Sequence, residues 1–137
     1  MRVCLLFAES DKSTKIEKLA SSLAKGLELN SHLVTLIDIE KEVPKSLAQY
    51  NYIVVLTSTN SFLGKNIPNS VEKFLVQSSS LGGKRSSAFV ANKGLRKQKT
   101  LLTLMKIMEK QGMFITFSDI LTNESFALEV GKRIKIS

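Results

Sequence analysis

The chain has 137 residues, of which 43% are hydrophobic and 23% charged, with 20 Lys or Arg against 12 Asp or Glu. This length suits one hydrophobic core, so a single domain over residues 1–137 is expected and a two-domain enzyme is excluded. The formal net charge of +8 makes a phosphate-rich ligand, a nucleic acid or an acidic protein a class of partner to consider. No apolar run approaches the roughly 18 residues of a membrane span, so no membrane partner is expected.

Cysteine and histidine each occur once, as Cys4 and His32. A lone cysteine forms no internal disulfide, and no signal-peptide cleavage site follows the first apolar run, so a cytoplasmic location is expected. Cys4 lies inside that run, which predicts a buried and unreactive thiol. No serine is paired with His32, so no catalytic constellation is visible and enzymatic activity remains open.

Five short apolar runs have the length of β-strands. The first and third are almost continuously apolar, which predicts strands covered on both faces, as in a parallel sheet between helices. The predicted strands are residues 3–7, 33–39, 53–56, 88–91 and 114–117.

Between the strands the apolar residues recur with a period near 3.6, which is typical of amphipathic helices. Thr14 and Glu17 form a capping box, so the first helix is predicted to begin near residue 15. Gly112 is placed to end the third helix, and Gly131 is expected to interrupt the fourth. The predicted helices cover about residues 15–27, 71–78, 98–110 and 123–132.

Strands that alternate with helices of this length imply right-handed crossovers and a doubly wound, three-layer α/β/α fold with a five-stranded parallel sheet. The segment 40–51 is too short and too broken by Pro44 for a full crossover helix. In such sheets ligands bind beyond the carboxyl ends of the strands, where the strand order reverses. Residues 8–14, 57–64 and 92–97 are therefore the expected ligand loops.

The first of these loops combines features with opposite consequences for an anion. Its hydroxyl groups and the free amides of the following helix suit a phosphate group. Glu9 and Asp11 repel a phosphate unless Lys12 offsets them or the two carboxylates point away. A phosphate-binding loop and an ordinary polar turn therefore both stay open for this segment.

Several features follow one another along the chain: the first strand, the hydroxyl-rich loop, the Thr-capped helix, the Thr-Ser-Thr-Asn-Ser segment after the third strand and the Gly-containing loop after the fourth. Together they resemble the flavodoxin family over essentially the whole chain. The resemblance implies a flavodoxin-like fold, FMN as cofactor and an electron-transfer or redox role. Glu9, Asp11 and Lys12 depart from the family's first loop, which has hydroxyl and glycine residues there.

The resemblance also implies which residues hold the cofactor. Hydroxyls of the first loop would hold the FMN phosphate, with Lys12 beside them. The second and third loops would flank the flavin ring, and Phe62 of the second loop would take the place of the usual Tyr or Trp. The implied cofactor-binding residues are Ser10, Lys12, Ser13, Thr14, Ser58, Thr59, Asn60, Ser61, Phe62, Asn92, Lys93 and Gly94.

The excess positive charge is concentrated in one segment. Residues 84–110 contain eight Lys or Arg and one acid, Glu109, so the rest of the chain is nearly neutral. A solvated helix face and a cationic rim beside the ligand loops are both compatible with this pattern. The rim supports an alternative hypothesis, a flavin-free binding or regulatory module for an acidic partner. No RNA-binding motif is visible, so no specific nucleic-acid partner is expected.

Overall fold

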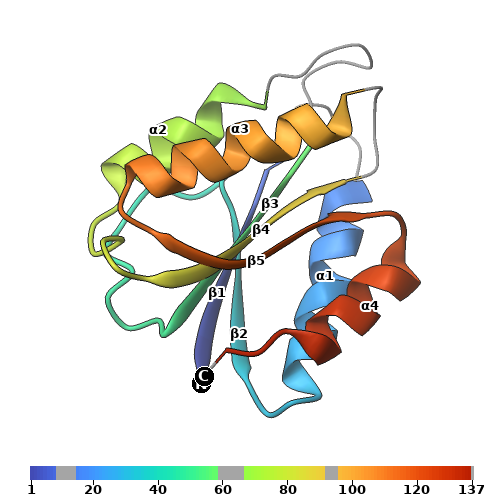
Figure 1. Cartoon of the computed structure of the whole chain (residues 1–137). Helices are drawn as coiled ribbons and strands as arrows, with labels where there is room; N and C mark the ends of the chain where they lie inside the picture. The colour runs from blue at the N-terminus through green and yellow to red at the C-terminus, as the bar shows by residue number, and fades with distance from the viewer. Residues whose placement is uncertain (9–14, 59–66, 92–95, 137) are drawn as a thin grey trace.

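A computed structural model describes residues 1–8, 15–58, 67–91 and 96–136. A five-stranded parallel sheet lies between two layers of helices, with the strand order β2-β1-β3-β4-β5 (Figure 1). This confirms the doubly wound three-layer fold. In chain order the elements are β1 (Arg2–Phe7), α1 (Lys15–Glu28), β2 (Leu33–Asp38), β3 (Tyr52–Thr57), α2 (Asn69–Gln77), β4 (Arg85–Ala91), α3 (Lys97–Lys110), β5 (Phe114–Leu121) and α4 (Glu124–Arg133).

The central strands are buried on both faces, as their continuous apolar sequences predict. Every residue of β3 is buried, and in β1 only Arg2 is exposed. The outer strands β2 and β5 are partly exposed. β5 extends to Leu121, four residues beyond the predicted strand, because its pairing with β4 continues after a register shift between Ser86 and Ser87.

Helices α1 and α4 cover one face of the sheet and lie side by side (Figure 1). The prediction that Gly131 interrupts the last helix is wrong, since α4 continues through it to Arg133. A Cβ atom built on Gly131 would lie 3.0 Å from Cα of Gly26 in α1, so glycine allows the two helices to approach this closely.

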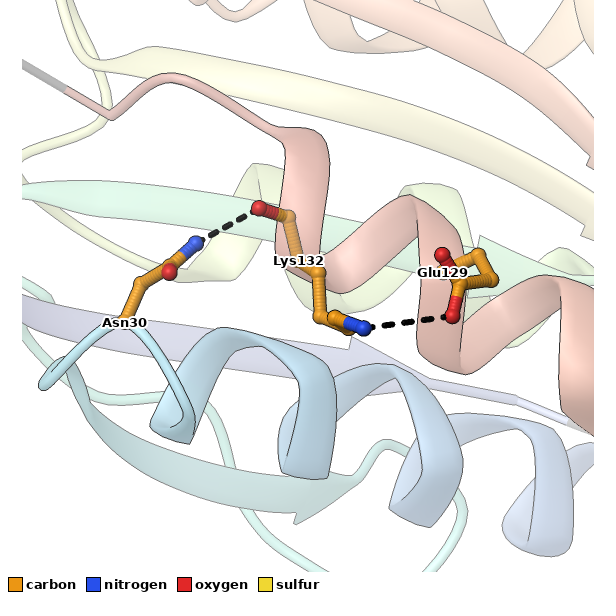
Figure 2. Close-up of polar contacts among 3 residues, drawn as sticks. All are labelled: Asn30, Glu129 and Lys132. Atoms are coloured by element: carbon orange, nitrogen blue, oxygen red, sulfur yellow. Dashed lines mark hydrogen bonds and ion pairs between the residues drawn. The ribbon is translucent and has the colours of Figure 1, made fainter.

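The C-terminal ends of the same two helices are joined by a polar contact (Figure 2). The Asn30 side chain, just after α1, donates a 2.6 Å hydrogen bond from Nδ2 to the carbonyl oxygen of Lys132. The Lys132 ammonium group in turn lies 3.3 Å from Oε1 of Glu129. Asn30 therefore satisfies a carbonyl of the last turn of α4 that has no partner within the helix.

Helices α2 and α3 cover the opposite face (Figure 1). α3 ends at Lys110, and Gly112 two residues later adopts a φ of 83°, which confirms the predicted glycine stop. No helix forms between β2 and β3, as expected for that short connection. None of the four helices in the described ranges has the length and apolar character required to cross a membrane.

Candidate functional site

The strand order reverses at the centre of the sheet. The chain passes from β1 to β2 on one side, and β3 pairs with β1 on the other, so β1 and β3 flank the switch point. Because all five strands are parallel, the connections that leave β1, β3 and β4 begin at the same edge. We call this the carboxyl edge; it is where the topology predicts a ligand.

The carboxyl ends of β1 and β3 are tied together at this edge. The backbone N–H of Ala8 donates to the Leu56 carbonyl at 3.0 Å, and Oγ1 of Thr57 donates to the Ala8 carbonyl at 3.2 Å. Both Ala8 and Thr57 are fully buried. Thr57 thus fixes the starting points of the first two ligand loops relative to each other. No sequence motif identifies Thr57, although a hydroxyl residue that ends an apolar strand is a usable signal.

Helices follow the strands at the carboxyl edge, and two of them begin directly after the first and third ligand loops. α1 starts at Lys15 after the first loop, and α3 starts at Lys97 after the third. The first amides of a helix have no partner within it and carry partial positive charge, so both helix starts favour anions. Arg96, at the N-cap of α3, provides no side-chain hydrogen bond to the helix.

The carboxyl edge differs in charge between its two sides. Beyond β2, a cleft of about 280 Å³ lies against α2, and the charged residues that line it are Glu40, Glu42 and Lys73. Ser70 of α2 donates a hydrogen bond to Glu40 across this cleft. Beyond β4, Arg96 and Lys97 begin α3. The described part of the edge is therefore of mixed charge on the β2 side and cationic on the β4 side.

Of the twelve residues predicted to bind a cofactor, Ser58 falls within the described residues. It follows β3 directly at the switch point and is fully buried. The remaining predicted site residues lie outside the described residues: Ser10, Lys12, Ser13, Thr14, Thr59, Asn60, Ser61, Phe62, Asn92, Lys93 and Gly94. Thr14 of the predicted capping box lies outside them too.

The two other titratable residues that the sequence analysis considered lie away from this edge. Cys4 is buried in the core between the sheet and α2 and α3, and burial raises the pKa of its thiol to about 12. It is therefore protonated and inert at neutral pH, as predicted. His32 precedes β2, and partial burial together with the charge of the N-terminal amine lowers its pKa.

No protein-family model and no curated protein sequence matches the chain. Among solved structures, it is similar to oxidised flavodoxin 1 from Bacillus cereus, with 20% identity, a TM-score of 0.74 and coverage of 98% of this chain and 100% of the other. It is also similar to a flavodoxin from the domain Archaea, with 19% identity, a TM-score of 0.73 and coverage of 97% and 92%. A short-chain flavodoxin associated with a non-canonical PDU bacterial microcompartment matches with 15% identity, a TM-score of 0.71 and coverage of 96% and 95%. The chain therefore has the flavodoxin-like α/β fold over nearly its whole length.

Proposed function

We propose that the chain binds FMN at the carboxyl edge, beside the switch point between β1 and β3, and transfers electrons to or from a redox partner protein. Two observations together support this proposal. The fold matches flavodoxins over nearly all of the chain, and the three loops that the sequence assigns to the cofactor all leave the sheet at one edge.

The described residues at this edge fit a phosphorylated ligand by the chemistry of their donors. The first amides of α1 follow the first loop directly, so they favour an anion there. Thr57 donates a hydrogen bond to the Ala8 carbonyl and so holds together the ends of β1 and β3, from which the first and second loops start. The hydroxyls of Ser13 and Thr14 would complete the phosphate site in this proposal.

FMN would supply the redox chemistry, and this chain would hold it and set its potential. Arg96 and Lys97 begin α3 directly after the third loop, which contains Lys93. Cations near a flavin favour the reduced form because that form carries more negative charge. We therefore expect a higher reduction potential than an acidic surround would give.

The direct test is a titration of the purified protein with FMN, followed by quenching of flavin fluorescence and by visible absorbance. Saturable binding at micromolar FMN is the expected result. Thr14→Ala should weaken binding about tenfold, because a hydrogen bond to a charged group is lost. Thr103→Ala is the matched control, since its hydroxyl donates to the Lys99 carbonyl within α3. Absence of binding at several hundred micromolar FMN would refute the proposal.

A second candidate is a flavin-free binding module on the same scaffold. It is favoured by Glu9 and Asp11, whose carboxylates stand in the loop that would hold the phosphate. The double variant Glu9→Ser with Asp11→Thr separates the two candidates. If the chain is a flavoprotein, this variant should tighten FMN binding that is already measurable. If the chain is a flavin-free module, binding should appear only in the variant.

A further inference from the structure

The outward face of α3 carries a row of basic residues with one large apolar residue among them. We define the basic stripe as Arg96, Lys99, Leu102, Lys106 and Lys110, which follow one another at intervals of three or four and so share one side of the helix. All five are exposed, and Leu102 is 59% accessible to solvent. The opposite side of α3 is buried against the sheet through Leu101, Leu104 and Met108.

At the start of α3 these charges do not stabilise the helix that carries them, whereas Lys110 lies in the last turn, where the helix dipole favours a cation. The first turn of α3 contains Lys97 and Lys99 but no acid, and cations there oppose the helix dipole. Lys106 and Lys110 are a like-charge pair at i and i+4, which is also unfavourable. Within the part of the chain that the structure describes, no ion pair joins these side chains to an acid. Their charge is therefore available to a partner outside the chain.

The position of the stripe relates it to the candidate site. It begins with Arg96, where α3 meets the carboxyl edge, and extends along a helix of 14 residues, about 20 Å by the usual rise per residue. The other side of the same edge is of mixed charge, because Glu40 and Glu42 line the cleft there together with Lys73. A negatively charged partner is thus attracted toward the α3 side of the edge more than toward the β2 side.

We propose that the basic stripe is a docking surface for an acidic protein. Leu102 favours a protein over a nucleic acid, because an exposed leucine between lysines finds an apolar partner on a protein surface but not on a phosphate backbone. The assignment of that partner as a redox protein rests on the proposed function, whereas the docking surface itself does not require a bound flavin.

The test is a titration of the isotope-labelled full chain with an acidic [2Fe–2S] ferredoxin, followed by NMR at low and at physiological salt. The expected result is saturable shifts of α3 amides that weaken as salt rises. Lys99→Gln, Lys106→Gln and Lys110→Gln together should weaken binding about tenfold. Leu102→Gln keeps the charge and should weaken binding about threefold through the lost apolar contact.

The matched control removes the same charge from elsewhere on the molecule. Lys18→Gln, Lys25→Gln and Lys135→Gln together change exposed lysines of α1 and of the segment after α4, and should alter binding less than twofold. Equal weakening in both triple variants would overturn the proposal, as would absence of ferredoxin binding. Tighter binding of a 20-base-pair DNA duplex, with the same dependence on the stripe, would also overturn it.

The same titration with and without added FMN separates this proposal from the proposed function. If FMN does not bind but the ferredoxin still docks on α3, the docking surface stands and the flavoprotein proposal fails. If FMN binds and α3 does not respond to the ferredoxin, the docking proposal fails and the flavoprotein proposal stands.

Discussion

Helices α1 and α3 have the same length, 14 residues, but differ in the charges of their first turns. The first turn of α1 contains an acid, Glu17, which the helix dipole favours there, between Lys15 and Lys18. α3 begins with Lys97 and Lys99 and has no acid in its first turn. The charges in the first turn of α3 are therefore the less favourable of the two, although both helices have a basic residue in their last turn.

The two helices are also held in different ways. α1 packs against a second helix, and the close approach of Gly26 to Gly131 leaves no room for a side chain between them. α3 is held by Leu101, Leu104 and Met108, which pack against the sheet, and its outer face is left to solvent. Since most helical stability in proteins comes from tertiary packing, α3 tolerates an unfavourable charge pattern on that outer face.

The largest effect is expected from a substitution that disrupts the contact between α1 and α4. Gly26→Ala would place a Cβ atom 2.9 Å from Cα of Gly131 and against the Leu128 carbonyl oxygen. Overpacking of this kind costs about 3 kcal/mol, and the better helix propensity of alanine recovers about 1 kcal/mol. We expect a net loss of about 2 kcal/mol in the free energy of unfolding, measured by urea denaturation with circular dichroism.

Gly82→Ala is the matched control for this measurement. A Cβ atom on Gly82 would meet no heavy atom within 4 Å. Its free energy of unfolding should stay within about 0.5 kcal/mol of the original, as is usual for surface substitutions. If both glycine variants lose the same stability, the close approach of α1 and α4 is not what constrains Gly26.

The contact between α1 and α4 could be predicted from the sequence only in part. The apolar period predicted α1 and α4, because each must bury one side against the sheet. Gly131 was interpreted as an interruption of the helix, because a glycine lowers helix propensity. Its benefit, a closer approach to a neighbouring helix, depends on which helix lies opposite. That neighbour is Gly26, more than a hundred residues earlier in the chain, and no local pattern identifies it.

The second effect concerns the layer that holds α3, where Cys4 is buried. Burial raises the pKa of its thiol from an ordinary 9.0 to about 12 in the folded protein. Between these values the unfolded chain loses the proton while the folded protein keeps it, so stability falls as pH rises above about 9. We expect this thiol to contribute a slope approaching 1.4 kcal/mol per pH unit, measured by urea denaturation from pH 8 to 11.

Cys4→Ala isolates this contribution from all other pH-dependent contributions to stability. The variant will be less stable at pH 8 because it leaves a small cavity, but its stability should fall less steeply above pH 9. Identical slopes in the two proteins would mean that the thiolate is not excluded from the folded core.

The candidate site was predictable to the level of the topology and no further. Alternating elements determine that the ends of β1, β3 and β4 meet at one edge, where Ser58 directly follows β3. The hydrogen bond from Thr57 to Ala8 was not predictable, because it joins two strand ends that are 49 residues apart. The cleft beside β2 also depends on tertiary contacts, since Glu40 and Ser70 are 30 residues apart.

The smallest effect tests the comparison of α1 and α3 directly, by exchanging their charges at equivalent positions. Glu17 and Lys99 each occupy the third residue of their helix. Glu17→Lys should lower the free energy of unfolding by about 0.5 kcal/mol, and Lys99→Glu should raise it by a similar amount. Both changes should shrink in 1 M salt, where the dipole interaction is screened. If Lys99→Glu instead destabilises the protein, Lys99 has a stabilising partner within the chain, and the basic stripe is not free to bind another molecule.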